Sequence, residues 1–208
     1  HVMALLDEGV DTIFYPCMSY NFDEHLADNH YNCPVVAYYP DLLAVNIPAL
    51  SKVKYLHPNL GIHRPKDFEK KGAKLLADEF GVPKRESVKA IRKAYEAYHG
   101  FRDLVQQKGA EYIDFARKSG RKILVVAGRP YHMDPEINHG INDIITSFGF
   151  VLVTEDAVFQ HMGKEPRHVL NQWTYHARMY NAARYVCTQP DMAFIQLVSF
   201  GCGVDAIT

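Results

Sequence analysis

The sequence lacks several features that would indicate particular classes of protein. No apolar stretch approaches the roughly 20 residues that a membrane-spanning helix needs. Net charge is nearly absent, since 23 Lys and Arg stand against 24 Asp and Glu, so electrostatics give no reason to expect nucleic acid or an anionic membrane as a partner. The opening residues lack the charged, apolar and cleavage regions of a signal peptide. We therefore expect a cytoplasmic protein.

Familiar catalytic motifs are also missing. There is no Walker A sequence, and Gly201-Cys202-Gly203 is not followed by the third glycine of a dinucleotide-binding fingerprint. No HExxH pattern occurs, which argues against a zinc hydrolase. Cys17 and Cys33 are too far apart in the sequence for a zinc-ribbon pair or a ferredoxin run. A nucleotide-dependent Rossmann enzyme is thus disfavoured, and cysteine spacing by itself identifies no metal site.

What the sequence does contain is an alternation of apolar strand-like runs and amphipathic helical segments. Residues 122–128 form a nearly continuous apolar run, typical of a parallel strand buried on both faces. The pattern predicts strands at 12–15, 34–39, 54–56, 122–128, 150–154 and 192–197, with helices at 2–9, 41–45, 65–80, 87–118, 136–148 and about 168–185.

This alternation predicts an α/β fold with two Rossmann-like lobes, mostly parallel sheets and long bridging helices. We expect an N-terminal lobe at residues 1–62, a helical connecting segment at 63–120 and a C-terminal lobe at 121–208. The last ten residues, 199–208, read as a strand end entering a new helix. We therefore expect the C-terminal lobe to be truncated and the chain to be part of a longer protein.

Ligand sites in open parallel sheets lie beyond the carboxyl ends of the strands. Polar and thiol side chains occur in just these predicted loops. Arg129, Tyr131 and His132 follow one strand, Glu155 follows the next, and Ser199 follows the last. The guanidinium of Arg129 can donate two parallel hydrogen bonds to a phosphate or carboxylate, although a surface ion pair explains an arginine in a loop equally well. We take these five as candidate substrate-binding residues and assign no catalytic residue.

The four cysteines suggest metal binding, catalysis or buried thiols before disulfides. Cys202 lies between glycines at an expected helix start, where aligned N–H dipoles favour a thiolate. Cys17 directly follows a strand, and Cys33 precedes a proline. Each of the three is a candidate metal ligand, and a simply buried thiol is the alternative for each. We interpret Cys187, at a helix end, as structural.

Four stretches together resemble a known family. They are Phe14-Tyr15-Pro16-Cys17, Asn32-Cys33-Pro34-Val35-Val36, Gly128-Arg129-Pro130-Tyr131-His132 and Ser199-Phe200-Gly201-Cys202-Gly203-Val204-Asp205-Ala206. The sequence resembles the dehydratase-related region of CoA-substrate-specific enzyme activases, a domain of unknown function that is similar to the D-component of 2-hydroxyglutaryl-CoA dehydratase. The resemblance spans essentially the whole chain.

The resemblance implies two α/β lobes with a [4Fe-4S] cluster between them, held by Cys17, Cys33 and Cys202, with a fourth iron site left for solvent or substrate. It also implies an ATP-dependent activase module in the same longer chain, absent from these residues, and a CoA thioester as substrate. A reduced cluster in that family generates a ketyl radical from a 2-hydroxyacyl thioester. The alternative is a non-catalytic binding or scaffolding domain whose cysteines are merely buried.

Overall fold

A computed structural model describes residues 1–164, 169–198 and 201–205 of the chain. These residues divide into two compact units, which we describe separately. Unit 1 comprises His1–Glu24, Asn29–Tyr95 and Gln172–Thr174, and unit 2 comprises His25–Asp28, Glu96–Asn171 and the described residues from Tyr175 onward. The long helix α4 (Lys84–Lys118) therefore contributes its first turns to unit 1 and the rest to unit 2.

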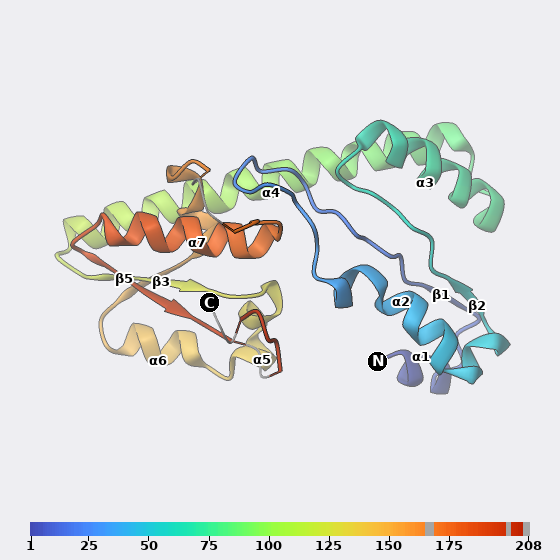
Figure 1. Ribbon diagram of the computed structural model, residues 1–208, viewed down its shortest axis with the longest axis horizontal. Coiled ribbons are helices and arrows are strands. Elements are labelled where there is room, and N and C mark those ends of the chain that lie inside the picture. The colour runs from blue at the N-terminus through green and yellow to red at the C-terminus, as the bar shows by residue number, and fades with distance from the viewer. Residues whose placement is uncertain (165–168, 199–200, 206–208) are drawn as a thin grey trace. The chain divides into compact units, whose positions relative to one another are not determined.

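Unit 2 is built on a parallel sheet of three strands in the order β4-β3-β5 (Figure 1). The strands are β3 (Ile123–Ala127), β4 (Val151–Thr154) and β5 (Met192–Gln196). Every residue of β3 is buried, as its continuous apolar sequence predicts for a central parallel strand. Parallel pairing brings the carboxyl ends of all three strands to one edge of the sheet.

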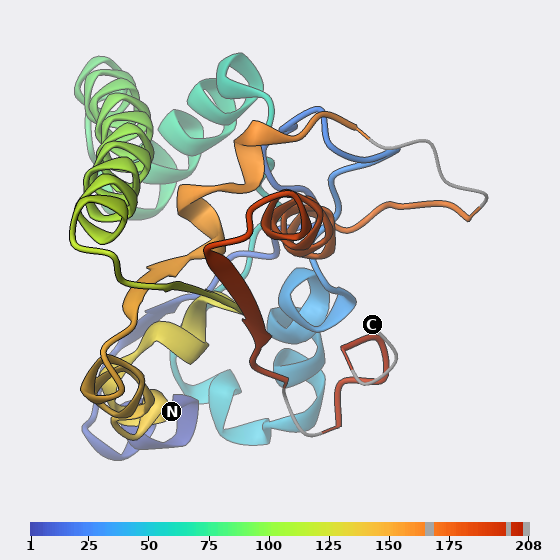
Figure 2. The ribbon, with the colours of Figure 1, turned by 90° about the vertical axis from the view of Figure 1, so that its left-hand side faces the viewer.

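Helices cover both faces of this sheet, as Figure 2 shows. On one face, α4 and α7 (Thr174–Cys187) contribute Ile113, Ala177 and Ala182 to a core with Ile123 and Val125. On the other, α6 (Ile141–Ser147) packs Ile145 against Leu124 and Val126. Short elements complete the unit: η2 (Pro130–Met133), α5 (Pro135–Asn138), η3 (Glu155–Ala157) and η4 (Phe159–His161).

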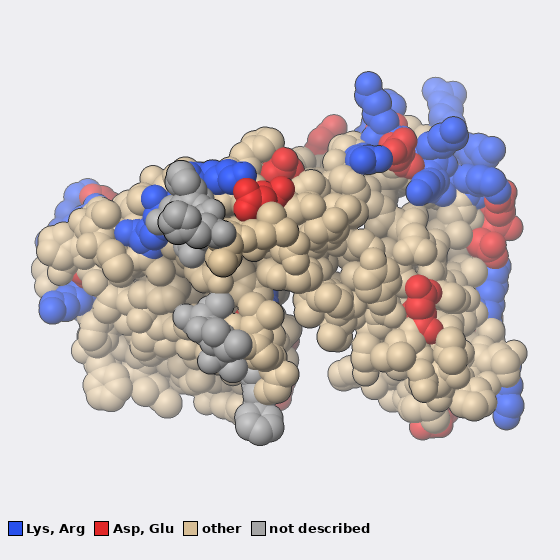
Figure 3. Space-filling view, viewed as in Figure 1, with Lys and Arg blue, Asp and Glu red and all other residues tan. Residues whose placement is uncertain are grey.

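Unit 1 has a smaller parallel sheet, β1 (Thr12–Phe14) paired with β2 (Lys54–Leu56). Its other elements are α1 (Val2–Asp7), α2 (Pro34–Asn46), η1 (Pro48–Lys52) and α3 (Pro65–Phe80). Lys and Arg side chains gather over α3 and the start of α4 (Figure 3). Ion pairs such as Arg92–Glu69 and Lys74–Asp78 partner some of these cations, so this surface is mixed in charge.

The predicted α/β class with parallel sheets is confirmed for the chain.

The strand predicted at 34–39 is wrong, because these residues open helix α2. Pro34 occupies the first helical turn, where its missing N–H costs nothing, and the Cys33 carbonyl accepts the Ala37 N–H at 2.9 Å. Only Ala37 and Pro40 of the helix are buried. Ala37 and Pro40 are three residues apart, so a helix brings both to the same buried face. The strand preference of the two valines is too weak to prevent this, since intrinsic propensity is often overridden by packing.

Two other helices differ from their predicted extents by a break or by more than three residues. The helix predicted at 136–148 is split into α5 and α6, because His139 and Gly140 adopt left-handed conformations with φ of 52° and 78°. The helix predicted from 168 begins at Thr174, and residues 165–168 lie outside the described part of the chain. Among the described helices, none combines the length and the apolar character required to cross a membrane.

Candidate polar site and cysteine loops

The carboxyl edge of the unit 2 sheet carries a buried group of charged side chains. Arg129 follows β3, Glu155 follows β4, and Asp205 lies in the turn after β5. His176 and Arg178 join them from the first turns of α7. All but Arg129 are among the buried polar residues, and the Arg129 side chain is itself only 11% exposed. This group is the candidate functional site of unit 2.

Arg129, Asp205 and His176 form a three-membered network. Arg129 donates from Nη2 to Asp205 Oδ1 at 2.7 Å and from Nε to Oδ2 at 3.3 Å. His176 Nε2 lies 3.0 Å from the same Oδ1 and 2.9 Å from Arg129 Nη2. Burial and the Arg129 charge lower the pKa of His176, against the opposing effect of Asp205. The network fastens the turn containing Asp205 to the loop that follows β3.

His132 is held close against the end of β3. Its Nδ1 accepts the Arg129 N–H at 2.9 Å, so this nitrogen is unprotonated. A Cβ at Gly128 would lie 2.5 Å from that Nδ1, which explains the glycine at this position. Burial lowers the pKa of His132. Tyr131, in contrast, is 47% exposed, with its ring centroid 4.6 Å from that of His132.

Glu155 is the most strongly perturbed carboxyl of the site. It is 5% exposed, and burial, with the neighbouring Asp156 charge, raises its pKa to about 8. Asp156 accepts a hydrogen bond from Arg178 Nη1 at 2.9 Å, and the Arg178 guanidinium lies 5.2 Å from the ring centroids of both Phe159 and Tyr175. Glu155 therefore retains its proton at neutral pH and is able to donate it.

The sequence correctly predicts Arg129, His132 and Glu155 at one edge of the sheet but does not reveal two of their neighbours. One of them is His176, which is 4% exposed and which no sequence motif marks. Asp205 belongs to one of the family-like stretches, but the sequence assigns it no partner. The sequence feature that could have indicated the burial of His176 is its position near the start of a helix that packs on the sheet. Side chains at that end of the helix point toward the strand ends. Ser199, the remaining candidate, lies outside the described residues.

Cys202 lies in the same turn of unit 2 as Asp205, three residues before it. Gly201 precedes it with a φ of 88°, a left-handed conformation that favours glycine. The cysteine is half-buried and unbridged. Because Arg129 and His176 hold Asp205, they also restrain the segment that carries the Cys202 thiol.

In unit 1, Cys17 closely follows β1 and is 1% exposed. Its backbone N–H donates to the Pro58 carbonyl and its carbonyl accepts the Leu60 N–H, each at 3.0 Å. Burial raises the pKa of the Cys17 thiol, and Asp41 of α2 acts in both directions, its N–H lowering and its carboxylate raising it. Cys33 is the residue at which α2 begins and is half-buried.

Asn32 joins the segments that carry these two cysteines. Its backbone N–H donates to the Ser19 carbonyl, and its Nδ2 donates to the Met18 carbonyl, both at 2.9 Å. Residues adjoining Cys17 are thereby paired with the residue before Cys33. Cys187, the fourth cysteine, ends α7 and is exposed. Within the described ranges, no three His, Cys, Asp or Glu side chains already stand in a metal-binding arrangement.

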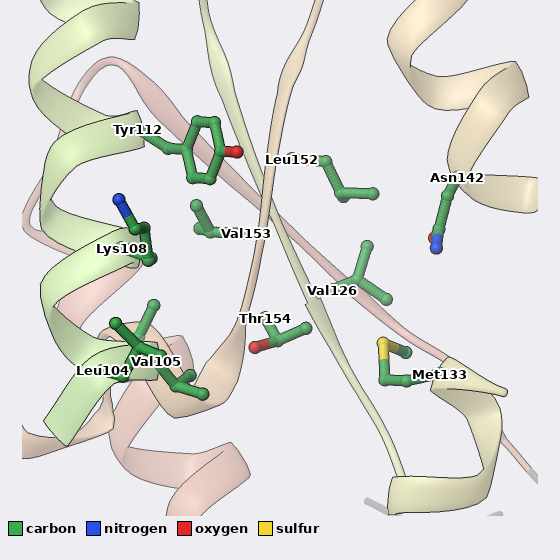
Figure 4. Close-up of a pocket in the computed structure, with 12 residues that line it drawn as sticks. Leu104, Val105, Lys108, Tyr112, Val126, Met133, Asn142, Leu152, Val153 and Thr154 are labelled. Atoms are coloured by element: carbon green, nitrogen blue, oxygen red, sulfur yellow. The ribbon is translucent and has the colours of Figure 1, made fainter. Parts of the chain in front are cut away.

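Unit 2 also contains an apolar pocket of about 350 Å³ that the sequence does not reveal (Figure 4). Leu104 and Tyr112 of α4 line one side of it near Val153 of β4, and Leu152 of β4 points to the other side, toward Asn142 of α6. Gly109 allows α4 to approach η3 there, since a Cβ at this residue would overlap the Cβ of Ala157. The pocket includes Thr154, directly before Glu155.

A family model described as the CoA enzyme activase uncharacterised domain matches residues 1–158. The match covers both cysteine loops of unit 1, together with Arg129, His132 and Glu155 of unit 2. No curated protein and no solved structure matches the chain. The resemblance to a region of CoA-enzyme activases is thus confirmed.

Proposed function

Because the chain belongs to the CoA enzyme activase uncharacterised-domain family, we propose that it is an iron–sulfur module of such an activase. The ligands are the thiolates of Cys17, Cys33 and Cys202, and the cofactor is a [4Fe-4S] cluster. The module works in the cytoplasm on a 2-hydroxyacyl-CoA thioester or relays electrons during its dehydration. An ATP-dependent activase module of the same longer chain is its partner.

The pairing of the two cysteine segments by Asn32 is the observation that carries this proposal. Hydrogen bonds at 2.9 Å to Met18 and Ser19 hold together two loops that each contain a thiol, although 15 residues separate Cys17 from Cys33. Because the two loops are already ordered, binding a cluster with their thiolates would cost little additional conformational entropy.

The donor set fits the chemistry of an iron–sulfur cluster. All four cysteines are unbridged, and thiolate sulfur is the ligand that such clusters use. The buried environment of Cys17 disfavours a free thiolate, whereas iron coordination stabilises the deprotonated form. The backbone N–H groups at the start of α2 lie beside Cys33 and lack partners within the helix. When bound, the cluster would supply one-electron transfer.

The charged group of unit 2 supplies the acid–base and anchoring functions of the proposal. Glu155, protonated at neutral pH, is the proposed proton donor to the substrate. Arg129 and His176 hold Asp205 and so position the turn that carries Cys202. Tyr131, which is exposed, and His132, which is buried beside it, are the proposed thioester-binding residues of the loop after β3.

A non-catalytic binding domain is the second candidate, favoured by the burial of Cys17. Anaerobic reconstitution with iron and sulfide separates the two functions. The iron–sulfur module is expected to bind about four iron and four sulfide ions per chain and to turn brown. Colourless, iron-free protein that remains folded by circular dichroism would establish the binding domain instead.

A further inference from the structure

Two histidines of unit 1, neither of them assigned to the cluster, have buried ring nitrogens without a hydrogen-bond partner. These atoms are His30 Nε2 and His63 Nδ1. The ring centroids lie 5.4 Å apart. Buried nitrogens are nearly always paired, because leaving one unpaired costs about 1–3 kcal/mol. Two such atoms on adjacent rings point to a shared ligand.

The separation of the rings matches two imidazoles on one tetrahedral ion. A zinc–nitrogen bond of about 2.0–2.1 Å places each ring centroid roughly 3.2 Å from the metal, so two centroids at the tetrahedral angle lie about 5.2 Å apart. The observed separation of 5.4 Å agrees with this value. The rings are inclined at 57° to each other.

The surroundings keep both imidazoles in place, and burial disfavours the protonation of His63. Tyr20 packs on both rings, with centroids 5.3 Å from His30 and 4.7 Å from His63, and its hydroxyl donates to Tyr31 at 3.0 Å. Burial lowers the pKa of His63, as do His30 and Arg64, with Asp67 opposing them. A neutral imidazole has a free lone pair, which is the form that binds a metal.

We propose that His30 and His63 bind one divalent transition-metal ion of the zinc type, with water completing its coordination. Imidazole nitrogen suits zinc, and two protein ligands give a weaker site than the four of a structural zinc centre. The site uses none of the three cysteines assigned to the cluster and does not depend on that assignment.

Isothermal titration of the metal-free chain with Zn²⁺ tests the site. One ion per chain should bind to it, and His30→Gln and His63→Gln should each weaken binding by roughly tenfold or more, because each removes half of the protein ligands. His161→Gln is the matched control, since that ring packs on Tyr185 in unit 2. It should bind Zn²⁺ as the wild type does.

Unchanged Zn²⁺ binding in both His30→Gln and His63→Gln, or no binding by the wild type, would overturn the proposal and leave ordered water as the missing partner. Circular dichroism of the metal-free variants verifies their folding. Cobalt substitution of the wild type is an independent measurement that needs no variant. Visible Co²⁺ bands without a thiolate charge-transfer band are expected, and a thiolate band alone would assign the metal to cysteines and refute the histidine site.

Discussion

The Arg129 guanidinium donates two hydrogen bonds to the Asp205 carboxylate, from Nη2 to Oδ1 at 2.7 Å and from Nε to Oδ2 at 3.3 Å. The pair joins the loop after β3 to the turn after β5, over 76 residues of sequence. Both side chains are buried, with exposed fractions of 11% and 2%. A pair of this kind stabilises the conformation of the turn, and with it the position of Cys202, only while both members are present.

Replacing Asp205 should therefore destabilise unit 2 strongly. Asp205→Ala leaves the Arg129 charge buried without its counter-ion, which typically costs about 3–5 kcal/mol. Urea unfolding of the variant against the wild type measures the change. Asp191→Ala is a matched control, because its pair with Arg117 at 2.8 Å is 30–43% exposed and should contribute less than about 1 kcal/mol. Equal losses for the two variants would refute the importance of burial here.

Glu155 should make the stability of the chain fall as pH rises. Its pKa is about 8 in the folded protein against 4.5 when unperturbed, so the folded state holds the extra proton between these values. The contribution of Glu155 to the free energy of unfolding should decline through that window and level off above it. Each pH unit inside the window should lower it by about 1.4 kcal/mol.

Glu155→Gln should remove most of this pH dependence and stabilise the protein by a few kcal/mol at pH 8, because the amide mimics the neutral acid. Urea unfolding at pH 5 and pH 8 checks the prediction. Glu136→Gln, on an exposed residue of α5, should leave the dependence as it is. The same change in stability between pH 5 and pH 8 in the wild type and in Glu155→Gln would contradict a buried, protonated Glu155, because the buried histidines contribute equally to both proteins.

Two glycines of α4 should respond oppositely to the same substitution. Gly109→Ala should destabilise by about 1–3 kcal/mol, because its Cβ would overlap Ala157 and overpack the contact with η3. Gly100→Ala should stabilise by up to about 1 kcal/mol, since nothing lies within 4 Å of its Cβ position and alanine is the better helix former. Thermal unfolding of both variants measures the difference, and equal shifts would contradict the close approach.

Much of the fold is predictable from local pattern. The apolar run that forms β3 and the sequence Phe80-Gly81 that ends α3 are local signals, and Gly81 indeed adopts a left-handed φ of 67°. Helix α2 is not predictable in this way. Its valines favour a strand locally, and the burial of Ala37 and Pro40 depends on contacts that single-residue preferences do not contain.

The candidate site is likewise predictable only where local pattern and strand topology determine it. Parallel topology suffices to bring Arg129, His132 and Glu155 to one edge of the sheet, because strand ends meet there. The burial of His176 depends on how α7 packs, and the orphaned nitrogens of His30 and His63 depend on loops of unit 1. Such packing between distant segments leaves no periodic signal in the sequence.

Iron content after anaerobic reconstitution of single cysteine variants tests the central claim most directly. The proposal predicts that Cys17→Ala, Cys33→Ala and Cys202→Ala each lose most of the iron of the wild type, because each removes a ligand. Cys187→Ala, at the exposed end of α7, should retain it. Iron that stays at the wild-type level in the first three variants, or falls equally in all four, would contradict the assigned cluster.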